Sequence, residues 1–493
     1  MNLDQLPIYE QLVSQSKMPL SLEKTLTPEK VTASVIHNGP ISLMYGTSLA
    51  DDTVLTLLQQ LAREQDVISK YKQLLAGTKV NHHNTRSPNR GFYGTQQETI
   101  STFSTHIHKE PITDVVQVGI GGSELGPKAV YHGLKRLIKP KITPHFIANI
   151  DPDDANDILS RIPEKTTLFI VVSKSGTTQE TLSNVSLIKA YLENKGLTNE
   201  NIKNQFILVT ANKSLPNNIP ARETFYIDEA IGGRYSTTSA VGGVLLSLVF
   251  GPEVFEELLD GASQIDKASE NPNIFENMAL MSALIGIWER NFLSMGARAI
   301  IPYSQGLSYF THHLQQLICE SNGKRVNIQN EKVSYQTSPI VLGDVGTNAQ
   351  HSFFQLFHQG TEPVPIQFIA FSEPQTHSNN SENNHDILLT HLASQMLALA
   401  TGNSDSSPAK SCPGNRPVSL IFGKKLTPKT MGALLSFYEN MVMFQSFIWN
   451  INAFDQEGVA LGKSYASSYM FDSSPPNPIM KRILTLFETG KDA

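Results

Sequence analysis

Short apolar runs that alternate with helical patterns are the feature that most restricts how this chain can fold. One of them, Leu168–Val172, contains only apolar residues, as expected for a parallel strand that is buried on both faces of a sheet. The short, predominantly apolar runs of the chain are Val115–Val118, Phe146–Ile150, Leu168–Val172, Phe206–Val209, Phe225–Ile227, Ala299–Ile301, Pro339–Leu342, Ile366–Phe371 and Val418–Phe422. Their alternation with helical patterns predicts βαβ units, and therefore parallel sheets covered by helices.

The alternation is interrupted by two apolar stretches, Ala240–Phe250 and Met278–Trp288, which are too short to span a bilayer and are predicted to be buried helices. A long apolar-rich helix is predicted over Thr430–Asn450, and solvated loops over Ser372–Asp386 and Thr401–Pro417. We predict an α/β protein with two doubly wound parallel-sheet subdomains and helical arms at both ends. The predicted parts are an N-terminal helical arm, two α/β subdomains and a C-terminal arm, at residues 1–95, 96–260, 261–465 and 466–493.

Composition excludes several classes of function. The chain has 493 residues, enough for two domains with sizeable cores, and its formal net charge of -6 with no long basic run argues against nucleic-acid binding. Two cysteines, Cys319 and Cys412, cannot form a disulfide framework, which suits a reducing cytoplasm. The N-terminus carries Asp4 and Glu10 and does not read as a signal peptide, so a cytoplasmic protein without a membrane anchor is expected.

The turn Ser173–Thr181 follows the continuous apolar run Leu168–Val172 and holds several hydroxyls, a lysine and a glycine. Backbone N–H groups at a helix N-terminus, together with hydroxyl donors, predict a seat for a phosphate dianion. Gly176 would let the backbone approach that anion closely. Thr177-x-x-Glu180 also fits a capping box, so a simple polar helix cap remains a compatible alternative.

A glycine-rich turn, Gly119–Ser123, follows the strand predicted at Val115–Val118. Its spacing is G-x-G-G-S, which does not match the G-x-G-x-x-G pattern of a dinucleotide site. Ser123 favours contact with a sugar or a phosphate, while a tight turn that needs glycine is the alternative. Ligands of open parallel sheets bind beyond the carboxyl ends of strands, where this turn and the turn at Ser173 both lie.

Glu320 is the candidate general base. An apolar periodicity predicts a helix around it, with Gly323 as the C-terminal cap, so Glu320 lies in the last turn. The helix dipole disfavours an anion at that end, which suits a group that takes up a proton. Gln316 lies four residues earlier on the same face. A solvated glutamate at a frayed helix end is the alternative.

A histidine and an arginine complete the candidate chemistry. Thr347–Gln350 fits a capping box, which predicts His351 in the first turn of a helix, where the dipole keeps imidazole neutral and able to exchange a proton. Arg234 lies beside two glycines at a strand end, where a fixed cation would stabilise an oxyanion. The alternatives are a structural histidine, which we favour for His358, and a surface ion pair.

Together these segments resemble the phosphoglucose isomerase family, within the wider class of sugar isomerase (SIS) domains. The resemblance covers about residues 80 to 465, in the family's order. Its segments are Val118–Ser123 with Leu125–Pro127, Ser173–Thr181, Gly232–Ser236, Gln315–Gln316 with Glu320–Lys324, Gly346–Asn348 with Gln350–His351, Gln355–Thr361, Gly414–Pro417 and Trp449–Lys463. The resemblance implies two SIS subdomains in an αβα sandwich and interconversion of glucose 6-phosphate and fructose 6-phosphate.

The resemblance also implies roles for individual residues. His351 and Lys463 would handle protons during ring opening, Glu320 would move a proton from carbon two to carbon one through an enediolate, and Arg234 would stabilise the oxyanion. Residues implied to contact the sugar phosphate or its hydroxyls are Gly122, Ser123, Ser173, Lys174, Ser175, Thr178, Gln316 and Gln456. Glu180 would orient His351, which in this family comes from the neighbouring subunit of a homodimer.

No metal and no nicotinamide is implied, and no nucleic-acid or membrane partner. One segment departs from the family pattern N-x-x-E-x-R, because Asn84 stands at the glutamate position of Asn81–Arg86. Two other functions stay open from the sequence: a related phosphosugar isomerase that also acts on mannose 6-phosphate, and a non-catalytic regulator that binds sugar phosphates.

Overall fold

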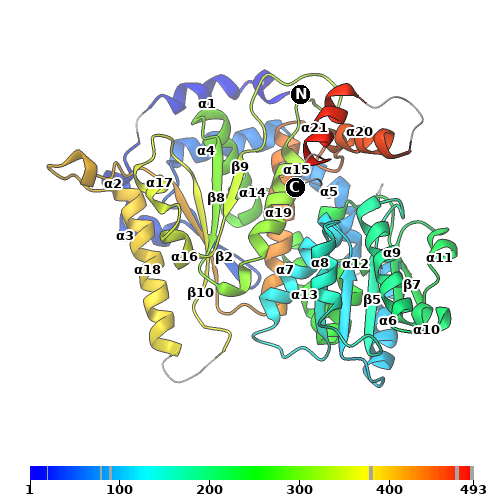
Figure 1. The fold of residues 1–493 in the computed structure, drawn as a ribbon. Helices are drawn as coiled ribbons and strands as arrows, with labels where there is room; N and C mark the ends of the chain where they lie inside the picture. The colour runs from blue at the N-terminus through cyan, green and yellow to red at the C-terminus, as the bar shows by residue number, and fades with distance from the viewer. Residues whose placement is uncertain (19, 78–79, 88–91, 377–380, 472–476, 489–493) are drawn as a thin grey trace. The chain divides into compact units, whose positions relative to one another are not determined.

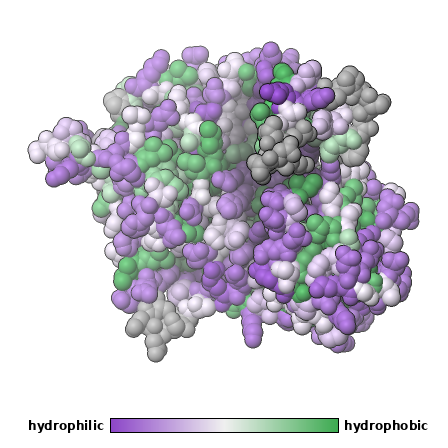
Figure 2. Space-filling view, viewed as in Figure 1, coloured by the Kyte–Doolittle hydropathy of each residue, from purple (hydrophilic) through white to green (hydrophobic). Residues whose placement is uncertain are grey.

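The structure is a computed structural model that describes residues 1–18, 20–77, 80–87, 92–376, 381–471 and 477–488. The chain forms two compact units, Met1–Ala453 and Phe454–Ala493. On the face shown in Figure 2, hydrophilic residues are interspersed with smaller hydrophobic patches, as is usual for a protein surface in contact with water.

The first sheet of unit 1 has five strands in the order β4-β3-β5-β6-β7, all parallel. Its strands are β3 (Asp114–Val118), β4 (Thr143–Ile147), β5 (Thr167–Val172), β6 (Phe206–Thr210) and β7 (Glu223–Tyr226). Every residue of β5 is buried, which confirms the expectation for an apolar run inside a covered sheet. On one face, Phe169 and Val171 share a core with residues of α8 (Pro152–Leu159) and α9 (Gln179–Asn194).

Helices α6 (Phe92–Ile107), α7 (Leu125–Leu134) and α12 (Ala240–Phe250) complete the layers around the first sheet, and α12 contacts β3 and β4 (Figure 1). All five predicted strands are present. The strand predicted at Phe146–Ile150 lies three residues earlier, because the turn that follows Ile147 is held by the Asp154 carboxylate, which accepts the N–H groups of Ala148 and Asn149.

The second sheet has six strands in the order β1-β2-β11-β10-β8-β9. Its strands are β1 (Val35–Asn38), β2 (Ile41–Met44), β8 (Ala297–Pro302), β9 (Ile340–Gly343), β10 (Ile366–Phe371) and β11 (Val418–Gly423). The last four are parallel to one another and confirm the predicted runs, while β1 and β2 form an antiparallel hairpin whose strand β2 pairs antiparallel with β11.

The hairpin of β1 and β2 lies in the segment for which only a helical arm was predicted. Its two loop residues are Gly39 and Pro40, since Asn38 pairs with Ile41, and Gly39 takes a φ of 57° at the first loop position, where glycine is favoured in two-residue hairpins. The N-terminal residues therefore add strands to the second sheet besides supplying helices such as α3 (Pro28–Ala33) and α4 (Asp52–Glu64). The division into arms and subdomains at 1–95, 96–260, 261–465 and 466–493 stays a prediction.

Buried helices join the two sheets. Figure 1 shows α19 (Pro428–Ile448) between them, and it packs against α13 (Pro252–Ala268) and α14 (Met278–Ile287). Every residue of α12 and α14 is buried, as predicted for the two apolar stretches. Within the described residues, no helix combines the length and the apolar character that a membrane crossing needs. The loop predicted at Ser372–Asp386 is partly wrong, since α18 (Ser381–Thr401) already begins at Ser381, and residues 377–380 lie outside the described residues.

A buried polar cluster lies between the segment Asn81–Arg86 and helices α13 and α19. Arg86 donates to both carboxylate oxygens of Asp266, at 2.6 and 2.8 Å, and to Oε2 of Glu439. Burial raises the pKa of Glu439 to about 7 although Arg86 opposes the shift, and burial lowers the pKa of His83 to about 4. Burial also works against the Asp266 anion, but the charge of Arg86 and the hydrogen bonds from Arg86 and Ser436 keep the pKa of Asp266 low.

Replacing Arg86 by methionine is expected to lower the free energy of unfolding by about 3–5 kcal/mol, because two buried carboxyl groups would lose their cation. Urea titration measures this change. Arg161→Met is the matched control, since the ion pair between Arg161 and Asp157 is mostly exposed and is expected to contribute less than about 1 kcal/mol. Equal losses in the two variants would contradict the structural role of the Arg86 cluster.

The position at which the sequence departs from the family pattern is occupied by a local cap. Asn84 accepts the N–H of Asn81 at 2.8 Å, and the Asn81 side chain in turn accepts the N–H of His83 at 3.0 Å. This reciprocal cap begins the short 3-10 helix His82–Thr85, which carries the chain into the Arg86 cluster. Asn84 therefore stabilises the segment that presents His82, His83 and Arg86 to the interior.

The described residues of unit 2 form the 3-10 turn Glu457–Val459 and then the helices α20 (Ala460–Phe471) and α21 (Pro478–Glu488). Within this unit, α21 exposes the apolar side chains of Ile479 and Phe487, at 72% and 74% of their accessible surface. The predicted helical character of the C-terminal end is thus present in the described residues.

Candidate active site

Glu320 lies in the last turn of α15 (Phe310–Asn322), and Gly323 follows as the C-cap, as predicted. Its Oε2 atom accepts a hydrogen bond of 2.9 Å from Nε2 of Gln316, one helical turn earlier. Its Oε1 atom lies 3.2 Å from Nη1 of Arg234. The carboxylate side chain is 25% exposed, so it is oriented by two partners and still accessible to a ligand.

Arg234 reaches this carboxylate from the 3-10 turn Gly233–Tyr235 and is 1% exposed. Its Nε donates to Oγ of Ser321 at 2.7 Å, and its Nη2 donates to the carbonyl of Ala453. All three nitrogens of the guanidinium therefore have partners, two of them consecutive residues of α15 and the third the carbonyl of Ala453. A cation fixed in this way is organised for charge stabilisation before any ligand arrives.

The glycine turn after β3 packs directly on the arginine turn. A Cβ atom at Gly122 would lie 2.0 Å from the carbonyl carbon of Gly233, so only glycine permits this contact. Gly121 has a φ of 63°, and a Cβ atom there would lie 3.2 Å from Nε2 of Gln316. The predicted requirement for glycine is therefore explained by the close approach of the Gly122 backbone to that of Gly233. The glycine turn lies beside both Arg234 and α15.

The turn at Ser173 follows β5, the neighbour of β3 in the sheet, so it lies at the same edge as the glycine turn. Ser173 accepts the N–H of Gly176 at 3.1 Å and donates to Oγ1 of Thr178 at 3.3 Å, while Ser175 accepts the N–H of Thr177 at 3.2 Å. The hydroxyls thus shape the loop around itself, with Gly176 at a φ of 70°.

Two details of that turn differ from the sequence predictions. The capping box at Thr177 and Glu180 is wrong, because Thr178 is the N-cap of α9 and makes no side-chain cap bond. Lys174 donates to the carbonyls of Glu229 and Ile231, at 3.1 and 3.3 Å. It thereby connects the hydroxyl-rich turn at Ser173 to the segment that leads into Arg234. The hydroxyl-rich turn, the glycine turn and the arginine turn therefore lie next to one another.

His351 does not lie where the sequence predicted it. Helix α16 (Gly346–Gln350) begins after Val345 without a side-chain cap, and His351 is its exposed C-cap residue rather than a residue of the first turn. The N-terminal dipole argument therefore does not apply to it. His358, in α17 (Phe354–Gln359), lies 2.8 Å from Oε1 of Gln395, in keeping with the structural role favoured for it.

Three other candidate residues lie on other elements of the chain. Glu180 is half-buried in the first turn of α9. Lys463 lies on α20 and Gln456 is the residue before the turn Glu457–Val459; both are exposed and belong to unit 2. The structure therefore brings together Glu320, Arg234 and Gln316 with the glycine turn. The assigned roles of all candidate residues stay predictions.

Two residues of the site were missed by the sequence reasoning, although both stand next to a candidate. Ser321 follows Glu320 and binds Arg234, and the Tyr235 hydroxyl lies 2.8 Å from Oγ of Ser321. Nothing in the residue types or their spacing signals this contact. It joins segments 86 positions apart in the chain, so only the tertiary structure reveals it.

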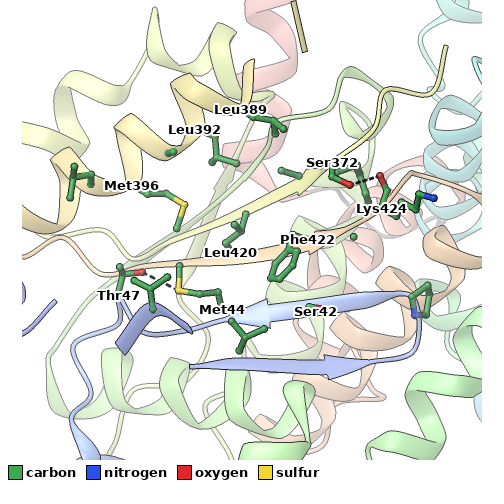
Figure 3. A pocket seen from close by; sticks show the side chains of 18 of the residues that line it. Ser42, Met44, Thr47, Ser372, Leu389, Leu392, Met396, Leu420, Phe422 and Lys424 are labelled. Atoms are coloured by element: carbon green, nitrogen blue, oxygen red, sulfur yellow. Dashed lines mark hydrogen bonds between the residues drawn. The ribbon is translucent and has the colours of Figure 1, made fainter. Parts of the chain in front are cut away.

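A cavity of about 790 Å³ lies elsewhere in unit 1, between α18 and the face of the second sheet (Figure 3). Its walls are mainly apolar, with Met396 from α18, Met44 from β2 and Leu420 from β11. The lysine in its lining, Lys424, pairs with Glu373 at 3.3 Å. A sugar phosphate needs many polar partners, so this cavity does not qualify as its site.

Comparison with known proteins identifies the family of the chain. The model of the phosphoglucose isomerase family matches residues 94–478. The chain belongs to the phosphoglucose isomerase family. Within the described residues, no group of three or more His, Cys, Asp or Glu side chains is arranged to hold a metal ion.

Relatives of the family are similar over nearly the whole chain. A glucose-6-phosphate isomerase of Treponema denticola is 47% identical over 474 residues, covering 90% of each chain. One of Protochlamydia amoebophila is 42% identical and covers 93% of this chain and 90% of the relative. The crystal structure of a glucose-6-phosphate isomerase from Chlamydia trachomatis superposes with a TM-score of 0.93 at 36% identity, covering 99% of this chain and all of the other.

Proposed function

We propose that this protein is a glucose-6-phosphate isomerase, which interconverts glucose 6-phosphate and fructose 6-phosphate in glycolysis and gluconeogenesis. The observation that carries the proposal is the carboxylate of Glu320, held between Gln316 and Arg234 beside the glycine turn and the hydroxyl-rich turn of the first sheet. The names of the relatives support the same reaction.

The reaction moves protons without net oxidation, so side chains alone can supply the chemistry. His351 and Lys463 act on the ring and carbonyl oxygens to open the sugar ring. Glu320 takes the proton from carbon two, which leaves an enediolate, and returns it to carbon one while the proton of the carbon-two hydroxyl is moved to the carbon-one oxygen. Arg234, whose guanidinium is already fixed, stabilises the negative charge that develops on the enediolate.

The phosphate group is assigned to the hydroxyl-rich turn. Ser173, Ser175 and Thr178 lie at the carboxyl end of β5 and at the N-terminus of α9, a 16-residue helix, where backbone N–H groups favour an anion. Ser123 and Gly122 approach from the neighbouring strand end, and Lys174 anchors the loop. Gln316 and Gln456 are assigned to the sugar hydroxyls.

A homodimer completes the proposed site, with His351 supplied by the neighbouring subunit and oriented by Glu180 of the receiving one. The exposure of His351 in the single chain is compatible with donation to a neighbour. A cytoplasmic location and a reaction without metal or nicotinamide belong to the same proposal.

The decisive experiment is the rate at which purified protein converts fructose 6-phosphate to glucose 6-phosphate without added metal or nucleotide. A coupled dehydrogenase reports the product, and mannose 6-phosphate formation is followed in parallel. Rapid formation of glucose 6-phosphate alone is expected. Formation of both epimers would favour the broader phosphosugar isomerase, and sugar-phosphate binding without turnover would favour a regulator and overturn the proposal.

A further inference from the structure

The hydroxyl of Ser321 is the junction through which Arg234 is fixed. Ser321 is fully buried and directly follows Glu320 in α15. Its Oγ atom accepts from Nε of Arg234 at 2.7 Å and lies 2.8 Å from the hydroxyl oxygen of Tyr235. The short side chain of Ser321 thus contacts both Arg234 and Tyr235, and the residue before it in α15 is Glu320.

The Ser321 hydroxyl is the shared partner of two side chains at this junction. The Nε of arginine can only donate, so Ser321 Oγ accepts there. The hydroxyl oxygens of Ser321 and Tyr235 are 2.8 Å apart and share a hydrogen bond in which either can be the donor. Because both side chains are almost completely buried, removing either hydroxyl would break a buried hydrogen bond that bulk water cannot replace.

Tyr235 is itself held from behind by a histidine ring. The rings of Tyr235 and His82 stack, with centroids 4.7 Å apart and an interplanar angle of 24°. His82 is 1% exposed, and burial keeps its pKa well below the ordinary value, so the ring that supports Tyr235 is neutral. Oε2 of Glu439, the carboxylate that Arg86 binds, lies 3.8 Å from Nε2 of His82.

We propose that Tyr235 and Ser321 form a positioning pair that holds the guanidinium of Arg234 in line with the carboxylate of Glu320. The pair connects the buried cluster around His82 to the site: His82 stacks on Tyr235, Tyr235 contacts Ser321, and Ser321 binds Arg234. The inference rests on the proposed isomerase function and adds two positioning residues to it. A displacement of a reacting group by about 1 Å costs on the order of 100-fold in rate, so loosening Arg234 should slow the chemical step.

The test compares Ser321→Ala, Tyr235→Phe and the double variant with the wild type. Tyr235→Phe keeps the ring that stacks on His82 and removes only the hydroxyl. Each single variant is expected to lower kcat about tenfold or more with KM changed less than about twofold, and the double variant is expected to equal the slower single one, because the two residues act as a unit. The isotope effect for glucose 6-phosphate deuterated at carbon two should rise, since proton transfer becomes more strongly rate-limiting.

Ser446→Ala is the matched control. Ser446 is a buried serine of α19 whose hydroxyl bonds only within its own helix, to the carbonyl of Met443 at 2.7 Å. A comparable loss of thermal stability with normal kcat and a normal isotope effect is expected. The same kinetic defect in this control would assign the effect to general destabilisation and overturn the positioning role.

Crystal structures of the variants provide a readout that does not depend on turnover. The separation of Arg234 Nη1 from Glu320 Oε1 should exceed the 3.2 Å of the native arrangement, or Arg234 should occupy more than one conformer. An unmoved Arg234 in both single variants would overturn the inference, whatever the activity. An inactive wild type with a displaced Arg234 in the variants would instead overturn only the proposed function.

Discussion

Replacing Glu320 by glutamine is expected to lower kcat for the isomerisation by about 10²–10⁴-fold, the loss typical for one proton-transfer catalyst. Glutamine keeps the size of the side chain and can still accept from Gln316 or Arg234, but it cannot take a proton from carbon two. Substrate affinity should change little, because the phosphate and hydroxyl contacts are assigned to other residues. Steady-state kinetics with fructose 6-phosphate and direct binding of the substrate to the variant measure both quantities.

The matched control is Glu200→Gln, which neutralises an exposed glutamate of helix α10 (Asn199–Gln205) in the same way. It should leave kcat and KM unchanged. A Glu320→Gln protein with near-normal turnover would contradict the assignment of Glu320 as the base. Loss of binding together with turnover would point instead to a role in holding the substrate.

The second prediction with a large effect concerns the subunit that supplies His351. Glu320→Gln and His351→Ala homodimers should each be nearly inactive, because each lacks one proton-transfer group in both sites. In a heterodimer of the two, one site would combine both defects and the other would contain intact Glu320 and His351. A heterodimer isolated with two different affinity tags should therefore regain about half of the wild-type activity, as two-fold symmetry requires.

The same measurement distinguishes a His351 that comes from the neighbouring subunit from a His351 that comes from the same chain as Glu320. If His351 acted in the site of its own chain, each site of the heterodimer would keep one defect and no activity would return. A wild-type heterodimer carrying the same two tags controls for the purification. A monomeric wild-type protein in solution would contradict the proposed dimer before any mixing.

Arg234 has more contacts than the stabilisation of an oxyanion alone would require. It already neutralises Glu320 in the resting site, at 3.2 Å, and a developing enediolate would share the same guanidinium. In the proposed mechanism Glu320 takes up a proton, so its attraction for the cation would fall while that of the enediolate would rise. A cation held in one place by Ser321 and Ala453 can serve both without moving.

Local patterns in the sequence were enough to predict the parallel strands of both sheets, the buried helices α12 and α14, and the position of Glu320 at the end of α15. Each of these depends on apolar periodicity and on short-range caps, which neighbouring residues determine. The prediction failed where a capping pattern in the sequence was not used as a cap in the structure. The capping pattern at Thr347 predicted a helix start, but α16 begins at Gly346 and ends before His351.

Only the tertiary structure decided which distant groups meet. The hairpin of β1 and β2 joins β11 through pairs such as Met44 with Leu420, and Arg234 meets Ser321 and Ala453, which lie 87 and 219 positions away. Contacts of this kind are selected by the packing of whole elements and by the need to pair every buried polar group, and these depend on the complete fold. The sequence by itself therefore determined the elements and the chemical types at the strand ends, while packing decided that Glu320, Arg234, Ser321 and Tyr235 form one site.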